Sequence, residues 1–298
     1  MAEITRKRTG ELLRALFELL MPQADGMPAG EALRALEKKA PPTPFEQSST
    51  ESGARRYEKI VRFATVDCVK AQWMIKAHGR WTITDEGRKA YAAYPDPEAF
   101  YKRAVYLYHE WRKSTPKATG GEEPVDGADP GTGKAARITF EQAEEQAWSE
   151  IEKYLASMQP YEFQELVAAL LRGMGYHVGW VAPPGKDGGV DIVAYNDPLG
   201  TRPPRIKVQV KRQQQKVAVD GLRSFMAVVG VDEVGIFVNA GGFTRDAEDE
   251  ARSQHARRVT LVDLERLVDL WVEHYARLDE AARRRLPLQP IYFLAPES

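Results

Sequence analysis

Two short segments in the second half of the chain carry residue types that suit metal-assisted hydrolysis. Residues 205–211 alternate between polar and apolar side chains, which predicts a β-strand with one buried face. Gln209 and Lys211 lie on its polar face, where they could simply meet solvent. Residues 190–195 are apolar except for Asp191, and a carboxylate in such a segment needs a cation or hydrogen bonds. If the two segments pair, Asp191, Gln209 and Lys211 converge on one spot.

A convergence of this kind suits Mg²⁺, a hard cation that takes oxygen ligands and keeps several waters. Asp191 would bind the metal directly, and the side-chain oxygen of Gln209 or the backbone carbonyl of Val210 would supply another ligand. Lys211 would hold or polarise the attacking water and offset negative charge on a phosphate. We therefore expect metal-assisted phosphodiester hydrolysis, with Mn²⁺ able to replace Mg²⁺.

A second carboxylate is desirable at such a site, because Gln209 brings no charge. Glu165 lies on an amphipathic helix just before these strands and is the first candidate, both as a metal ligand and as a catalytic group. Asp187, in a glycine-rich loop, is the reserve.

The elements that must position these residues form an alternating series. Helices are predicted at 161–174, 219–229, 244–254 and 263–275, and strands at 176–181, 190–195, 205–211, 234–238 and 259–262. Such alternation favours an α/β domain with a mixed central sheet flanked by helices. An acidic amphipathic helix at 140–158 is expected to brace this domain.

The first half of the chain is mostly helical. Helices are predicted at 11–20 and 31–40, and the long stretch 55–78 is expected to form two more; a short strand at 81–83 and a helix from Thr84 or Asp85 to Tyr94 follow. Helices followed by a small β-wing and another helix follow the order of a winged helix, a helix-turn-helix variant. The alternative is a helical interaction domain that never contacts DNA.

Several basic side chains are the candidates for contact with phosphates. Residues 1–112 carry 19 Lys or Arg against 15 Asp or Glu, a balance of +4, which is compatible with a polyanionic partner. The candidates in this half are Arg55, Arg56, Lys59, Arg62, Lys70 and Arg80. Lys186 and Arg212 are the candidates beside the hydrolytic site.

Length and composition favour two domains and exclude several classes. The 298 residues are about twice the usual domain length, and residues 113–137 are so rich in Gly, Pro and charge that we expect a flexible linker between domains at 1–112 and 138–298. With 43% apolar and 29% charged residues, the chain is neither fully disordered nor fibrous. No apolar run reaches the ~20 residues of a membrane span, and no secretory signal is visible. Cys68 is the single cysteine, so no internal disulfide or Cys-rich zinc site is possible, and we expect a cytoplasmic protein.

Several motifs together resemble one known family. FQE (163–165), GMGY (173–176), DGGVDI (187–192) and VQVKR (208–212) are similar to the catalytic domain of Mrr-type restriction endonucleases, of the PD-(D/E)xK superfamily. The resemblance continues through VGIFV (234–238), GFTRDA (242–247) and VTLVD (259–263), and thus covers about 160–272. It implies the acid at Asp191, a variant QxK at Gln209 and Lys211, and the helical glutamate at Glu165.

The N-terminal half also resembles the winged-helix domain that accompanies this catalytic domain, through WMI (73–75) and GRWTITDEGR (79–88). Two segments depart from the family pattern: the long Ser/Pro-rich loop at 40–53, which bears on recognition, and VNAGG (238–242), which bears on contacts with substrate.

The resemblance implies an endonuclease that restricts foreign double-stranded DNA, with some relatives directed at methylated DNA. Cleaving both strands would need two active sites, so we expect a homodimer or a higher assembly. Two alternatives remain open. One is a non-catalytic DNA-binding or regulatory protein that keeps the nuclease fold, and the other is an effector nuclease whose N-terminal domain senses a partner.

Overall fold

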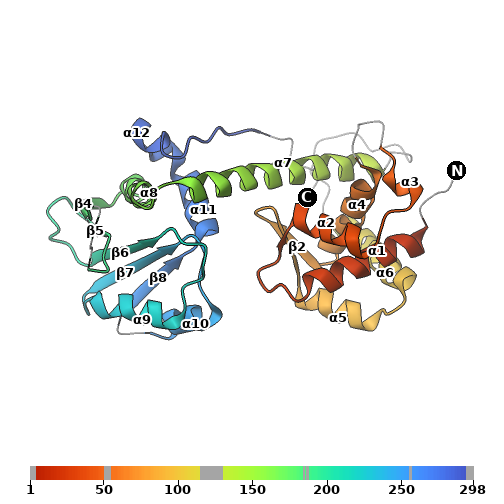
Figure 1. Cartoon of the computed structure of the whole chain (residues 1–298), viewed down its shortest axis with the longest axis horizontal. Helices are drawn as coiled ribbons and strands as arrows, with labels where there is room; N and C mark the ends of the chain where they lie inside the picture. Colours follow the sequence, from red (N-terminus) through yellow and green to blue (C-terminus); the bar gives the residue numbers. More distant parts are fainter. Residues whose placement is uncertain are drawn as a thin grey trace. The chain divides into compact units, whose positions relative to one another are not determined.

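The chain divides into two compact units, which we describe separately (Figure 1). The computed structural model describes residues 5–49, 55–114, 130–183, 185, 188–254 and 257–292. Unit 1 extends to Ser149, and unit 2 covers Glu150–Ile291. The division therefore falls later in the chain than the linker expected at 113–137. None of the helices in the described ranges is long and apolar enough to cross a membrane.

Unit 1 is a helical domain with a small antiparallel sheet. Its elements are α1 (Arg6–Leu20), β1 (Met27–Pro28), α2 (Ala29–Lys39), α3 (Pro44–Gln47), α4 (Arg56–Lys70), β2 (Met74–Ala77), β3 (Arg80–Ile83), α5 (Asp85–Ala93) and α6 (Pro97–Ser114). The sheet order is β1-β3-β2, with Trp81 of β3 opposite both Met27 and Lys76.

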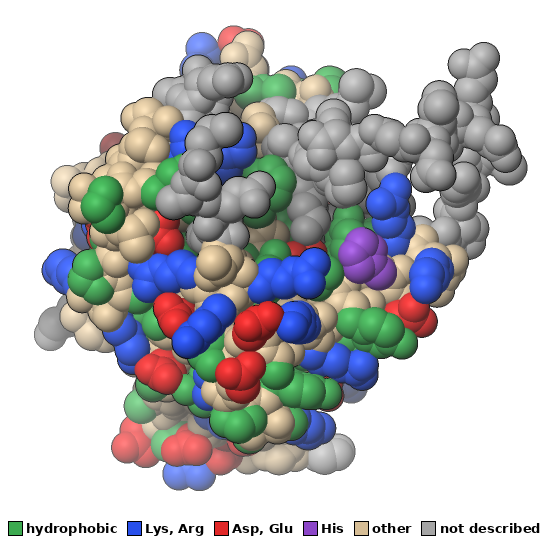
Figure 2. All heavy atoms as spheres, turned by 90° about the vertical axis from the view of Figure 1, so that its right-hand side faces the viewer, with side chains coloured by type: hydrophobic (Ala, Val, Ile, Leu, Met, Phe, Trp, Pro, Cys, Tyr) green, Lys and Arg blue, Asp and Glu red, His purple; other side chains and the backbone are tan. Residues whose placement is uncertain are grey.

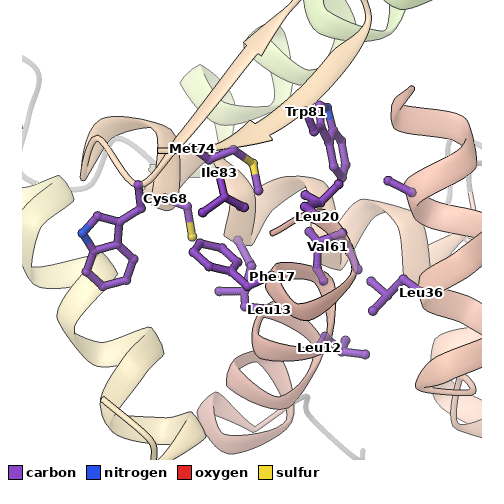
Figure 3. Packing of buried hydrophobic residues seen from close by; sticks show 14 of the residues in the cluster. Leu12, Leu13, Phe17, Leu20, Leu36, Val61, Cys68, Met74, Trp81 and Ile83 are labelled. Atoms are coloured by element: carbon purple, nitrogen blue, oxygen red, sulfur yellow. The ribbon is translucent and has the colours of Figure 1, made fainter. Parts of the chain in front are cut away.

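The core of unit 1 lies between α1, α4 and the sheet (Figure 3). The apolar face of α1 contributes Leu13, Phe17 and Leu20, each fully buried, as its helical spacing predicts. Trp81 reaches the same core from β3 and is also fully buried. Because both strands and helices supply this core, the position of the β2–β3 hairpin is fixed relative to α4.

The structure corrects the prediction of a second helix before residue 78, because residues 74–77 form β2. Helix α4 ends at Lys70, and Gln72 then adopts a left-handed conformation with φ 62°. His78 and Gly79, with φ of 49° and 69°, turn the chain back into β3. The apolar residues that resemble a helical stripe therefore belong to a hairpin.

Unit 2 is built on a mixed sheet, and this confirms the predicted α/β class with helices on both faces. Its elements are α8 (Pro160–Gly173), β4 (His177–Val181), β5 (Ile192–Tyr195), β6 (Arg205–Lys211), α9 (Val219–Val228), β7 (Glu233–Asn239), α10 (Arg245–Ser253), β8 (Arg258–Val262), α11 (Leu264–His274), η1 (Tyr275–Arg277) and α12 (Glu280–Arg283). The strand order is β4-β5-β6-β7-β8, antiparallel as far as β6 and parallel from β6 to β8.

Each face of this sheet is covered by its own helices. Ile206 and Val238 face the side of α8 and α11, where they line an apolar cavity of about 460 Å³. Phe237 faces the opposite side and packs with Leu222 and Phe225 of α9. Figure 1 shows α8 and α11 above the sheet and α9 and α10 below it.

Helix α7 (Pro130–Ser157) begins inside the segment expected to be a linker, so residues 130–137 are helical. Pro130 is tolerated because the first helical turn needs no N–H donor there, and residues 134–137 are good helix formers. Lys113 and Ser114, the first residues of that predicted linker, end α6, and residues 115–129 lie outside the described residues. The part of α7 up to Ser149 belongs to unit 1, which corrects the expectation that this helix only braces the C-terminal domain.

Candidate functional site

The segment that contains Asp191 pairs with β6, as the convergence of the site residues requires. Ile192 lies opposite Val208, and the backbone N–H of Asp191 donates to the carbonyl of Val208 at 2.8 Å. The Asp191 side chain is only 5% exposed. Its Oδ2 accepts a hydrogen bond from the backbone N–H of Val210 at 2.7 Å. The carboxylate is therefore held against the backbone of β6, between Gln209 and Lys211.

Gln209 lies beside the loop that leads into Asp191. Its Nε2 is 3.8 Å from the position that a Cβ would occupy at Gly189. Gly188 and Gly189 have φ of 63° and 85°, a region that residues with a Cβ rarely adopt. The two glycines thus let the backbone turn close to the amide of Gln209, directly before Asp191.

Lys211 shares a face of β6 with Gln209, because side chains two apart in a strand point to the same side. Its Nζ lies 5.4 Å from the centroid of the Phe237 ring on the neighbouring strand β7. The backbone carbonyl of Lys211 accepts from the N–H of Ala240 at 3.0 Å, which fixes the end of β6. Lys211 therefore lies at the end of β6, two residues after Gln209 and beside the segment that carries Asp191.

The second carboxylate has a different environment. Glu165 lies on α8, where its Oε1 accepts from the hydroxyl of Tyr161 at 3.4 Å and its Oε2 lies 3.6 Å from a guanidinium nitrogen of Arg285. Asp187 and Lys186 lie outside the described residues. Within the described ranges, no group of three or more His, Cys, Asp or Glu side chains is close enough to hold a metal ion. The role of Glu165 stays a prediction.

The described donors nevertheless fit a hard cation. Asp191 supplies a buried carboxylate, Val210 a backbone carbonyl and Gln209 an amide oxygen, all of them oxygen ligands on one strand pair. One carboxylate with two neutral oxygens leaves about half of an octahedral shell to water, and Mg²⁺ commonly keeps several waters.

Gln164 is a positioning residue that the sequence reasoning missed. Its side-chain Nε2 donates to the carbonyl of Ala182 at 2.9 Å and to that of Asp191 at 3.3 Å. It therefore ties α8 to the end of β4 and to the backbone of the acid. The signal available in the sequence is its place in the FQE motif, between the fully buried Phe163 and the charged Glu165.

Gln164→Ala is expected to loosen the segment that carries Asp191. Two buried carbonyl oxygens would lose a donor, which costs about 1–2 kcal/mol, so amide hydrogen exchange in residues 188–195 should accelerate about tenfold. Gln254→Ala is the matched control, because that glutamine is exposed and, among the described residues, its amide bonds to Glu250 alone, at 2.9 Å. Equal exchange in both variants would contradict the positioning role.

One of the predicted phosphate contacts in unit 1 is covered by another element of the same unit. Arg62 is only 5% exposed, and its two terminal nitrogens donate to the Glu145 carboxylate at 2.9 and 2.8 Å. In this arrangement Arg62 cannot reach a phosphate, because a helix distant in sequence covers it. Arg80 is also engaged, donating to the backbone carbonyls of Asp25 and Gly26 at 3.0 and 2.9 Å.

The remaining basic residues of unit 1 are more accessible, and their role in DNA contact stays a prediction. Arg55 pairs with Glu37, Arg56 lies over the ring of Phe45, Lys59 lies near Phe63, and Lys70 lies over Trp111. On the face drawn in Figure 2, Lys and Arg side chains are interspersed with Asp and Glu and form no unbroken positive patch.

Arg212, the predicted phosphate contact beside the site in unit 2, donates to the backbone carbonyl of Ala156. Its Nε is buried without a hydrogen-bond partner among the described residues. The guanidinium thus lies at the C-terminal end of α7, where carbonyl groups lack partners within the helix.

Comparison with known proteins assigns a domain type to the segment that contains Asp191, Gln209 and Lys211. Residues 155–271 match the model of the Mrr_cat family, described as a restriction endonuclease. No match was found among curated proteins. A solved structure of the MspJI restriction endonuclease in complex with a 27-mer oligonucleotide is similar at a TM-score of 0.32 and 16% sequence identity. That alignment covers 65% of this chain and 45% of the MspJI chain, so this chain spans less than half of its length.

Proposed function

We propose that this chain is a Mg²⁺-dependent endonuclease that hydrolyses phosphodiester bonds of double-stranded DNA. The restriction endonuclease domain at 155–271 supports a nuclease acting on DNA. The observation that carries the finer proposal is the buried Asp191 carboxylate, held at 2.7 Å by the N–H of Val210 on the strand that presents Gln209 and Lys211. This gives an acid, neutral oxygens and an amine on one pair of strands inside a domain of that type.

In this mechanism Asp191, the carbonyl of Val210 and the side-chain oxygen of Gln209 would hold the metal. When bound, Mg²⁺ supplies a Lewis acid and lowers the pKa of a bound water. The Lys211 ammonium orients the water that attacks phosphorus and offsets the charge that develops on the phosphate oxygens. Gln164 fixes the backbone of Asp191 from α8, so that the carboxylate keeps its place during the reaction.

Unit 1 is proposed as the DNA-reading domain. Its order of helix, strand, helices and a β-hairpin is typical of winged helices, in which the helix before the hairpin enters the major groove. That helix is α4 in this chain. A defence role against foreign, including methylated, DNA would place the protein in the cytoplasm, and a cut in both strands would require a homodimer or a higher assembly.

Incubation of supercoiled plasmid with the purified chain tests this function. We expect nicked and linear products with Mg²⁺ or Mn²⁺, and complete loss of cleavage in chelator, because the metal is required for attack. Methylated and unmethylated plasmid run side by side report whether modified bases are read. Cleavage that persists in chelator would contradict the metal site. DNA binding without cleavage under every metal and methylation state would favour the non-catalytic alternative.

A further inference from the structure

The first half of α7 packs within unit 1 against α4 and the β2–β3 hairpin through paired charges. Arg62 of α4 makes two hydrogen bonds to Glu145, at 2.9 and 2.8 Å. Lys76 of β2 donates to Glu141 at 2.6 Å. The Arg62, Lys76 and Glu141 side chains are 6%, 8% and 10% exposed, and that of Glu145 is 16% exposed, so both ion pairs are largely removed from water.

The hairpin turn is shaped to accept this helix. A Cβ at Gly79 would lie 3.3 Å from the Cα of Glu145, so a side chain at this position would crowd the helix. The ring of His78 packs against Trp148, with 5.0 Å between ring centroids. Ile138, one turn before Glu141, is 7% exposed. The contact therefore combines close backbone approach, apolar packing and two ion pairs.

The cations involved belong to the two elements that a winged helix uses on DNA, namely the helix before the hairpin and the hairpin itself. A carboxylate that receives two parallel N–H groups from arginine presents the same oxygen geometry as a phosphate bound by that arginine. Glu145 therefore stands where a DNA phosphate would bind Arg62. Glu141 pairs with Lys76 through one carboxylate oxygen, at 2.6 Å, as a phosphate oxygen would.

The energetics make this contact exchangeable. Burial lowers the pKa of the Lys76 ammonium, and the attraction of Glu141 opposes this effect. The charge on Lys76 is therefore kept at a cost in desolvation free energy. The Nε of Arg62 is also buried without a hydrogen-bond partner in the described part of the chain. A buried ion pair gains little net free energy once desolvation is counted. DNA phosphates can therefore replace the two glutamates at small net cost in ion-pair free energy, which leaves the apolar packing of α7 as the cost of displacing it.

We propose that residues 138–149 of α7 are an intramolecular competitor of DNA. Their acidic face occupies the phosphate-binding surface formed by Arg62 on α4 and Lys76 on the hairpin, and duplex DNA must displace it. The free chain is then autoinhibited for DNA contact through unit 1. This proposal rests on the proposed function, in that unit 1 is taken as a reader of DNA.

A pair of charge-matched variants tests the competition. Glu141→Gln with Glu145→Gln removes both carboxylates from the surface, and Glu150→Gln with Glu152→Gln removes two exposed carboxylates of the same helix that lie outside 138–149. Binding of a short fluorescent DNA duplex is measured in chelator by fluorescence anisotropy. We expect the first variant to bind about tenfold more tightly than wild type, a usual size of coupling between two competing contacts. The control should stay within about twofold of wild type.

A second measurement on the wild-type chain decides the matter if the first variant does not fold. DNA is added in chelator, and amide hydrogen exchange is followed along the chain. Exchange in 138–149 should rise when DNA binds, while exchange in α4 and β2 should fall. Unchanged or slower exchange in 138–149 would overturn the proposal.

Three other results would also overturn the competition. One is equal DNA affinity in both variants while the wild type still cuts plasmid with Mg²⁺, which leaves the proposed function intact. Another is tighter binding of polyglutamate without tighter binding of DNA, which would assign the surface to an acidic protein partner. The third is failure of wild type and variants alike to bind or cut DNA with any metal, which would remove the proposed function as well.

Discussion

Asp191→Asn is expected to lower the rate of Mg²⁺-dependent plasmid cleavage by about a thousandfold or more. Asparagine has the shape of aspartate and keeps an oxygen that can accept from the N–H of Val210, at 2.7 Å in the wild-type chain. The substitution removes the negative charge. Asp191 is the one predicted carboxylate ligand that the described structure holds against the backbone of β6. The fold should therefore remain while metal affinity and cleavage are lost.

The measurement is the initial rate of plasmid nicking over a range of Mg²⁺ concentrations, with circular dichroism to verify the fold. Asp232→Asn is the matched control, because this substitution makes the same change in charge at an exposed residue in the short connection between α9 and β7. The control should cut at the wild-type rate. A cleavage rate for Asp191→Asn within about tenfold of wild type would contradict the assignment of the metal site.

The strands of the site could be predicted because their signal is local. Residues 205–211 alternate without exception, and β6 spans Arg205–Lys211 as predicted. Residues 190–195 correspond to β5 with a start two residues later, at Ile192. Period-two alternation fixes which side chains share a face, so the strand pair alone brings Asp191 and Gln209 together.

The ion pairs of α7 could not be predicted, because their partners lie far apart in the chain. Arg62 and Glu145 are separated by 83 positions, and nothing near Arg62 distinguishes it from the exposed basic residues of the same helix. Gln164 presents a similar difficulty, since an amide that holds backbone carbonyls carries no charge pattern. Both depend on tertiary contacts that period and propensity do not encode.

The hairpin at 74–83 shows the opposite case, in which a local pattern favoured a helix but tertiary packing produced a strand. Val69 and Trp73 are one helical turn apart in the sequence, yet Trp73 and Met74 are buried from a turn and a strand. The left-handed conformation of Gln72 ends the helix without a glycine. Such a break in a residue with a Cβ has no reliable sequence signature.

Lys211→Gln is expected to reduce cleavage at saturating DNA about a hundredfold, with DNA affinity nearly unchanged. Lys211 ends β6, and Lys207 lies on the same face of that strand, two alternations before it. The two lysines have different surroundings. Lys207 is 2.7 Å from a Glu233 carboxylate oxygen and donates to the carbonyl of Val228 at 2.7 Å. Lys211 has no carboxylate partner among the described residues and contacts the ring of Phe237. Its ammonium is therefore available for water and phosphate.

Lys207→Gln is the informative comparison, because it removes the same charge from the same face. Its loss should destabilise unit 2, since Glu233 would keep a half-buried carboxylate without its closest cation, while cleavage by the folded fraction is maintained. Single-turnover rates and DNA affinities of both variants, with thermal unfolding of each, separate the two roles. A fall in DNA affinity without a fall in the single-turnover rate of Lys211→Gln would make Lys211 a phosphate-binding residue only. A lowered rate in Lys207→Gln with unchanged stability would assign the amine of the site to Lys207, two alternations back along β6.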